Sequence, residues 1–207
     1  MGVNARPNST ATDAYGCAIT AFFDVSANID NASGPWLRRN TGASVGNTAG
    51  FNFNNGAFIW VDWLPQIFTK LMTFTDITST RIWVGSFSSN PAGSDDPTLD
   101  GMGFRFSTVA SDTTWQAFTN DNSGGGTITD TGITVSLSTA YILVIVVEST
   151  SSIKFYISTD VGVSFSLVAT HTTNLPTGSI GDYYFEVETR TTAARGLSHG
   201  FTNIRMR

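Results

Sequence analysis

The sequence has very few of the residues from which solvated helix surfaces are built. Among 207 residues there are two lysines, Lys70 and Lys154, and three glutamates, Glu148, Glu186 and Glu188. Helix surfaces normally carry many Lys, Glu, Gln and Arg side chains, so this scarcity excludes a mainly helical fold. Threonine, serine and glycine are abundant instead, which favours strands and turns.

Cysteine and long apolar runs are equally scarce. The single cysteine, Cys17, cannot form an intrachain disulfide, so packing and backbone pairing must hold the fold together. The longest apolar run, residues 140–147, is far below the roughly 20 residues that cross a bilayer, which predicts no membrane insertion. The N-terminus lacks the basic-then-apolar layout of a secretion signal. We therefore expect a protein made in a cytoplasm and not exported.

Positive charge is also sparse. The formal net charge is −5, and Arg38 and Arg39 are the only adjacent basic pair, which we interpret as part of a solvated loop. Nucleic-acid binding draws its affinity from clustered lysine and arginine, so we expect no nucleic-acid partner.

Short β-rich runs between turn signals recur along the chain. Residues 153–158 alternate apolar and polar side chains, and residues 57–63 are predicted as another alternating strand. Residues 141–147 are apolar throughout, which is typical of a strand covered on both faces or of one that meets another subunit. The pattern predicts an all-β, antiparallel two-sheet sandwich: a single domain over residues 17–207, preceded by an extended arm over residues 1–16.

The order of several motifs resembles a known family. The motifs are Gly-Phe-Arg-Phe at 103–106, Trp-Gln-Ala-Phe at 115–118, Ile-Lys-Phe-Tyr-Ile at 153–157 and Asn-Leu-Pro at 174–176. This order resembles the concanavalin A-like (LamG-like) jelly-roll domains of structural proteins of tailed bacteriophages. The resemblance covers residues 57–207 and implies a hairpin formed by the lysine-aromatic strand and the strand that leads to Asn-Leu-Pro.

An insertion, Ser-Thr-Asp-Val-Gly-Val-Ser at 158–164, lies in this hairpin and is similar to the phrase of sialidase-type repeats in which an aspartate caps a turn. We interpret it as turn chemistry, with Gly162 adopting positive φ.

Catalytic residues are hard to identify. Glu186 and Glu188 lie two apart and share one strand face; we interpret that face as solvated, and an inverting glycosidase that uses the two carboxylates remains the least favoured alternative. The resemblance implies a Glu-x-Asp-x-(x)-Glu signature for jelly-roll glucanases, which this sequence lacks. His171 and His199 are expected to be surface or hydrogen-bonded residues. The sequence therefore predicts that the chain is not an enzyme.

Binding residues are predicted in two loops, residues 90–97 and 120–126, which are rich in Asn, Asp and Gly. A carbohydrate site with an aromatic floor would use Trp36, Asn90, Asp95, Asn120 and Asn122. No obligatory cofactor is expected, although Asp95, Asp96 and Asp100 are candidate calcium ligands. Trp60, Trp83 and Trp115 are expected in the core.

These observations favour a bacteriophage virion protein, such as a head decoration, tail or fibre component, located in the virion. It would act by forming homo-oligomers and docking on other virion proteins. The alternative is a lectin-like module that binds cell-surface glycans.

Overall fold

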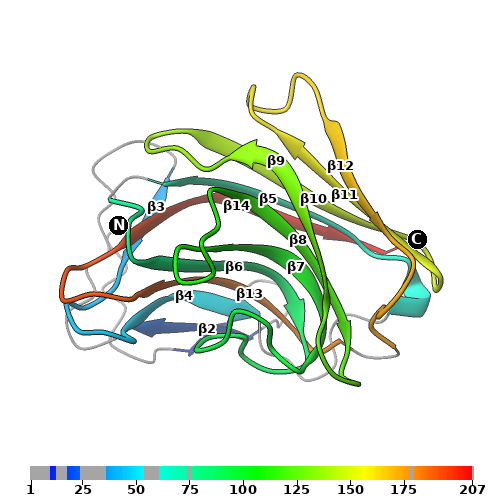
Figure 1. Cartoon of the computed structure of the whole chain (residues 1–207), viewed down its shortest axis with the longest axis horizontal. Coiled ribbons are helices and arrows are strands. Elements are labelled where there is room, and N and C mark those ends of the chain that lie inside the picture. Colours follow the sequence, from blue (N-terminus) through cyan, green and yellow to red (C-terminus); the bar gives the residue numbers. More distant parts are fainter. Residues whose placement is uncertain are drawn as a thin grey trace.

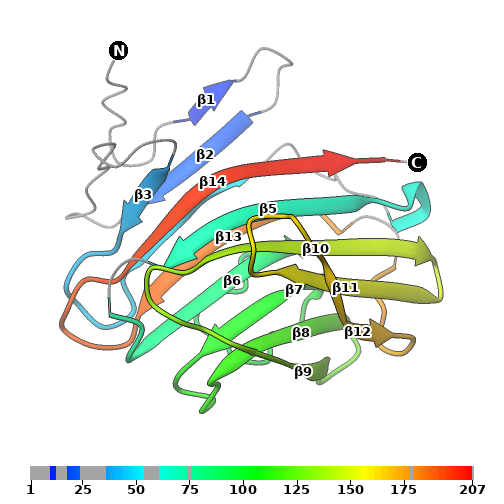
Figure 2. The ribbon, with the colours of Figure 1, turned by 90° about the horizontal axis from the view of Figure 1, so that it is seen from above.

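The computed structural model describes residues 10–12, 18–23, 36–53, 61–73, 76–177 and 180–206. Within these ranges the chain forms two antiparallel sheets that stack face to face (Figures 1 and 2). The eight-stranded sheet has the order β1 (Thr10–Thr12), β2 (Ala18–Phe23), β4 (Thr48–Phe53), β13 (Asp182–Thr189), β6 (Thr80–Phe87), β7 (Asp100–Ser107), β8 (Thr114–Asp121), β9 (Thr127–Thr134). The six-stranded sheet has the order β12 (Ser166–His171), β11 (Ser152–Ser158), β10 (Ala140–Ser149), β5 (Gln66–Thr73), β14 (Gly196–Arg205), β3 (Leu37–Asn40).

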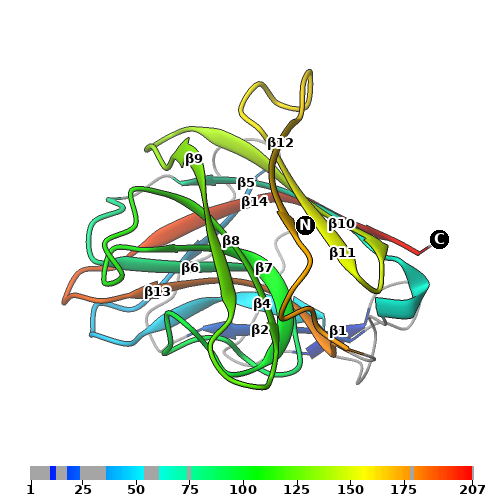
Figure 3. The same cartoon turned by 45° about the vertical axis from the view of Figure 1, so that its right-hand side comes forward.

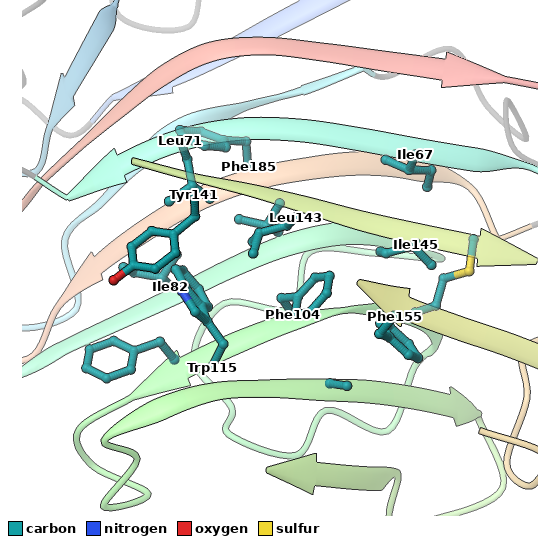
Figure 4. Close-up of a cluster of buried hydrophobic side chains, with 14 of the residues drawn as sticks. Ile67, Leu71, Ile82, Phe104, Trp115, Tyr141, Leu143, Ile145, Phe155 and Phe185 are labelled. Atoms are coloured by element: carbon teal, nitrogen blue, oxygen red, sulfur yellow. The ribbon is translucent and has the colours of Figure 1, made fainter. Parts of the chain in front are cut away.

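The core lies between the two sheets and follows from strand alternation. In β5 every second residue is buried, and Ile67 and Leu71 point inward. They belong to one buried cluster with aromatic side chains of the opposite sheet, including Phe104, Trp115 and Phe185 (Figure 4). Because apolar burial is worth about 25 cal/mol per Å², this dry layer is the main source of stability.

The predicted fold class is confirmed: the chain is an all-β, two-sheet antiparallel sandwich. Residues 141–147 form most of β10, which lies between β11 and β5. Among the described residues no helix is long and apolar enough to cross a membrane.

Two local predictions are wrong. The last part of the predicted strand 57–63 is instead a short 3-10 turn, Val61–Trp63, and residues 54–60 lie outside the described ranges. Arg38 and Arg39, interpreted as a solvated loop, belong to strand β3, and Arg39 is buried. Arg38 and Arg39 are held in a strand by pairing with β14, a long-range neighbour that sequence patterns do not reveal.

Part of the predicted N-terminal arm is an edge strand, because Thr10–Thr12 pairs with β2. The rest of the arm, residues 1–9 and 13–16, and also Cys17 and Trp60, lie outside the described residues.

The loop between β11 and β12 projects from the sandwich (Figure 3). Asp160 accepts hydrogen bonds from the Ser164 amide at 3.0 Å and from the Ser158 hydroxyl at 2.7 Å, and Gly162 has φ +94°. The predicted turn chemistry is therefore confirmed.

Candidate functional site

The outer face of the eight-stranded sheet carries an unusual row of polar side chains. Glu186 of β13 is in register with Trp83 of β6, and Trp83 is in register with Arg105 of β7. Phe185 and Val187, which flank Glu186, point into the core, so strand alternation sends the glutamate outward. Glu188 and Arg81 form the next row on the same face.

Four buried aromatic side chains form a floor beside this polar row. They are Trp83, Phe87, Phe118 and Tyr184, and the first three make edge or tilted contacts with centroid separations of 5.1 to 6.1 Å. Phe87 lies directly over the backbone of β7, because a side chain at Gly101 or Gly103 would meet its ring at 2.4 or 2.7 Å. The two glycines therefore make room for the floor.

The segment that joins β6 to β7, residues 88–99, folds back over this face and is called the covering loop below. The Trp83 indole Nε1 donates to the Ser94 carbonyl at 3.2 Å, and the Gly93 amide donates to Glu188 Oε2 at 3.3 Å. The sheet's outer face is therefore dry at its centre, with Trp83 only 1% exposed.

Ion pairs fasten the covering loop to the sheet. Arg81 binds Asp95 of the loop at 2.6 Å and Glu188 of β13 at 2.7 Å. Arg190 binds the other Glu188 oxygen at 2.6 Å. Arg105 donates to the Asp95 carbonyl and is itself fixed by Asp112. Each buried charge in this network thus has a charged partner.

Glu186 is the exception. It is 1% exposed, and neither carboxylate oxygen accepts a hydrogen bond of ordinary geometry. Burial, followed by the charge of Glu188, raises the pKa of Glu186 to about 8, against smaller opposing effects of Asn90 and Arg81. A carboxyl group in this setting is protonated at neutral pH. The interpretation of Glu186 and Glu188 as a solvated face is wrong, because β13 is a central strand and the covering loop excludes water.

Three loops meet at one end of the sandwich. Asp96 of the covering loop accepts a hydrogen bond from the Gly126 amide at 2.9 Å, and Asn120 donates to the Pro97 carbonyl at 3.0 Å. Asn174, in the loop after β12, donates to the Gly125 carbonyl at 3.3 Å. The two loops predicted to form a binding site, 90–97 and 120–126, are therefore in direct contact, and Phe118 lies beneath Gly126.

The predicted carbohydrate residues have different surroundings. Asn90 and Asn122 are exposed on these loops, and Asn122 has φ 63°. Asn120 is fully buried and bridges two loop segments, so it is a structural residue. Asp95 is bound to Arg81. Trp36 lies elsewhere, against β5 and β14 of the other sheet.

The predicted calcium ligands each have a separate partner. Asp95 binds Arg81, Asp96 binds the Gly126 amide, and Asp100 accepts a hydrogen bond from the Thr177 amide at 3.1 Å. No group of three or more metal-ligating side chains was found among the described residues. The structure thus does not bring these three carboxylates together as one cluster.

Two tryptophans and the two histidines complete the set of residues singled out from the sequence. Trp83 and Trp115 are buried as expected, although Trp83 lies on the outer face under the covering loop. His171 is hydrogen-bonded to two threonines at 2.9 Å, and His199 is bonded to Thr202 at 2.9 Å.

Sequence reasoning missed Arg81, Arg105 and Arg190 as parts of the site. Arg81 and Arg105 each stand in a strand of otherwise apolar or small residues, on the face opposite to the core residues. A charge in that position needs a buried partner, and this was the signal available in the sequence.

The stacked, curved sheets define the class of protein: a concanavalin A-like jelly-roll sandwich. No protein-family model matches the chain, and no curated protein matches its sequence. Solved structures match over most of the chain. A prokaryotic β-1,3-1,4-glucanase (lichenase) from a mouse hindgut metagenome aligns with a TM-score of 0.60 and 12% identity, over 87% of this chain and 84% of that one.

Two further solved structures are similar to the chain. The exoplasmic/lumenal domain of VIP36, bound to Ca²⁺ and mannose, aligns with a TM-score of 0.56 and 12% identity over 91% of this chain and 82% of that one. The alginate lyase from Klebsiella pneumoniae aligns with a TM-score of 0.52 and 7% identity over 87% of this chain and 84% of that one. At such identities the likeness establishes the fold alone.

The comparisons correct one prediction. The chain was predicted not to be an enzyme, but a glucanase and a lyase are among the structures with the same fold. The absence of the Glu-x-Asp-x-(x)-Glu signature is therefore insufficient to exclude catalysis, particularly since the structure holds a buried carboxyl pair that the sequence interpretation placed in solvent.

Proposed function

We propose that the chain binds carbohydrate where the covering loop meets the loop of residues 122–126. The observation that carries this proposal is the contact between the two polar loops above the aromatic floor. Asn122 is exposed, and its side-chain amide makes no hydrogen bond with the described residues. An unpaired amide beside backbone groups of a glycine-rich loop provides the donors and acceptors that sugar hydroxyls require. The similarity to a mannose-bound lectin-like domain supports this choice.

Asn122→Gly tests the proposal, because glycine tolerates the positive φ of this position while the amide is lost. We expect binding of mannose- and glucose-containing oligosaccharides, measured by titration calorimetry, to weaken by about tenfold. Ser138→Gly is the matched control: Ser138 is also exposed at positive φ, in the loop between β9 and β10. Equal affinity in wild type and Asn122→Gly would contradict the proposal.

A second candidate function is glycan cleavage, favoured by the state of Glu186. A protonated, desolvated carboxyl group is suited to act as a general acid, and the neighbouring Glu188 forms ion pairs with two arginines. This reaction requires the covering loop to move so that a glycan reaches the pair. The test is cleavage of β-1,3-1,4-glucan and alginate by wild type and by Glu186→Gln. Activity that survives the substitution excludes Glu186 as the acid.

The assignment as a virion component that self-associates and docks on other virion proteins remains a proposal drawn from the resemblance. The projecting β11–β12 loop supports self-association, because Val161, Val163 and Phe165 are exposed there and Leu167, at the start of β12, is exposed as well. Sedimentation of the full chain at micromolar concentration tests it: a monomer at all concentrations contradicts the homo-oligomer.

A further inference from the structure

The outer face of the six-stranded sheet carries a strip of aromatic and cationic side chains along β5 and β14. Figure 2 looks onto this face, with the two strands side by side. Lys70 and Phe68 of β5 point away from the core. On β14, Phe201 is in register with Lys70, and Arg205 is in register with Gln66, two residues before Phe68. Phe201 is 42% exposed.

Each cation of the strip stands against an aromatic ring. Lys70 Nζ lies 4.9 Å from the centroid of the Trp36 ring, and the Arg205 guanidinium lies 5.6 Å from the Phe68 ring. Such cation–π contacts hold the charged groups in place without neutralising them. Lys70 and Arg205 form no ion pair with any described residue, whereas Lys154 on the same sheet is paired with Glu148 at 2.7 Å.

The backbone is adapted to one of these pairs. A side chain at Gly200, where β14 is bulged, would meet Trp36 Cζ3 at 3.0 Å and Lys70 Cδ at 3.1 Å. Glycine at this position therefore allows the tryptophan ring and the lysine stem to lie flat on the strand. From Gly200 to Arg205 the strand rises roughly 17 Å, which is long enough for an oligosaccharide of several units.

From this arrangement we propose that the strip formed by Trp36, Lys70, Phe201, Phe68 and Arg205 is a binding site for an acidic polysaccharide chain. Sugar rings have apolar faces that stack on exposed aromatic rings such as Phe201, and carboxylates of uronic acids complement Lys70 and Arg205. The chain carries a net charge of −5, so two cations without an ion pair among the described residues are uncommon in this protein and suit an anionic ligand. This site lies on the opposite sheet from the loops of the proposed function and does not depend on them.

Charge density favours a polysaccharide over a nucleic acid. Nucleic acids bind through many phosphate contacts, each of which releases counterions, and two cations on an acidic chain supply few such contacts. An acidic polysaccharide needs fewer protein cations than a nucleic acid, because stacking of its sugar rings on aromatic side chains also contributes to binding.

The test is binding of hexagalacturonate to the full chain, measured by titration calorimetry at low and at physiological salt. We expect the Lys70→Gln/Arg205→Gln variant to bind about tenfold more weakly or worse, and higher salt to weaken the wild type. Lys154→Gln, which removes a cation already neutralised by Glu148, is the matched control and should bind like wild type.

Several outcomes would overturn the proposal. If a neutral oligosaccharide such as cellohexaose binds as tightly as hexagalacturonate, the cations have no role in binding. If single-stranded DNA binds more tightly than hexagalacturonate, the strip is a nucleic-acid site. If the wild type dimerises with rising concentration and the double variant does not, the strip is a contact between two copies of the chain. Phe201→Ala, which removes the exposed ring but keeps every charge, must also weaken hexagalacturonate binding; unchanged affinity contradicts the role of ring stacking.

Discussion

At the scale of single residues, the burial of Glu186 has an energetic cost. Its carboxyl group is buried, lacks a hydrogen bond and faces a second carboxylate. Folding therefore favours the protonated form, so this residue lowers stability once the unfolded chain ionises. Positions of this kind are frequent at functional sites, where stability is given up for a chemical property.

The sign of the resulting pH dependence is fixed. The pKa of Glu186 is about 8 in the folded chain against an ordinary 4.5, so the folded state holds the proton more tightly. Stability from this residue is fully present below pH 4.5 and is lost as pH rises to about 8. We predict that Glu186→Gln raises the free energy of unfolding at pH 8 by roughly 2 to 4 kcal/mol and has little effect at pH 4.5.

Urea denaturation at both pH values measures this difference. Glu148→Gln is the control, because Glu148 forms an exposed ion pair with Lys154. A Glu186 variant that is less stable than wild type at pH 8 contradicts the description of this site.

At the scale of elements, the covering loop decides what the outer face can do. Sequence alternation located most strands, since the inward positions of β5 and β11 are plainly periodic. Strand order was less accessible, because β13 lies between β4 and β6, which are far from it in sequence. The burial of Glu186 was not predictable for the same reason: it results from a loop that precedes it by many strands.

The loop's attachment through Asp95 leads to a second prediction. Asp95→Asn removes the charge that binds Arg81, although Glu188 still occupies that guanidinium. We expect a loss of roughly 1 to 2 kcal/mol in unfolding free energy and a more mobile loop. Trp83 should then show red-shifted fluorescence and faster acrylamide quenching, since the loop covers its ring.

Asp76→Asn is the control for this experiment. Asp76 is 57% exposed and lies 3.6 Å from Arg195, so its loss should change neither stability nor fluorescence by much. Unchanged Trp83 quenching in Asp95→Asn would show that the ion pair does not hold the loop.

At the scale of the whole molecule, three buried titratable groups make stability depend on pH in opposite directions. Burial, assisted for His199 by Arg39, lowers the pKa of both His171 and His199 from 6.5 to about 4. Their stabilising effect is complete above pH 6.5 and is lost as pH falls toward 4, while that of Glu186 is lost in the alkaline direction.

Together, the contributions of these three groups predict that the free energy of unfolding is greatest near pH 6.5. Between pH 4.5 and 6.5 the two histidines outweigh the single glutamate, and between 6.5 and 8 only the glutamate changes. Thermal melts followed by circular dichroism from pH 4 to pH 9 measure this profile. Melting temperatures that rise steadily up to pH 9 are incompatible with it.

The glycines of β7 also constrain how the protein can change over evolutionary time. Any larger residue at position 101 or 103 collides with the Phe87 ring and also with a backbone carbonyl of β6, Ser86 O or Val84 O, at 2.9 Å. Truncation of Phe87 opens a void in the aromatic floor and leaves the backbone collision in place, so it does not free either position. A lineage that keeps the pairing of β6 with β7 therefore keeps glycine at both positions, whatever residue stands at position 87.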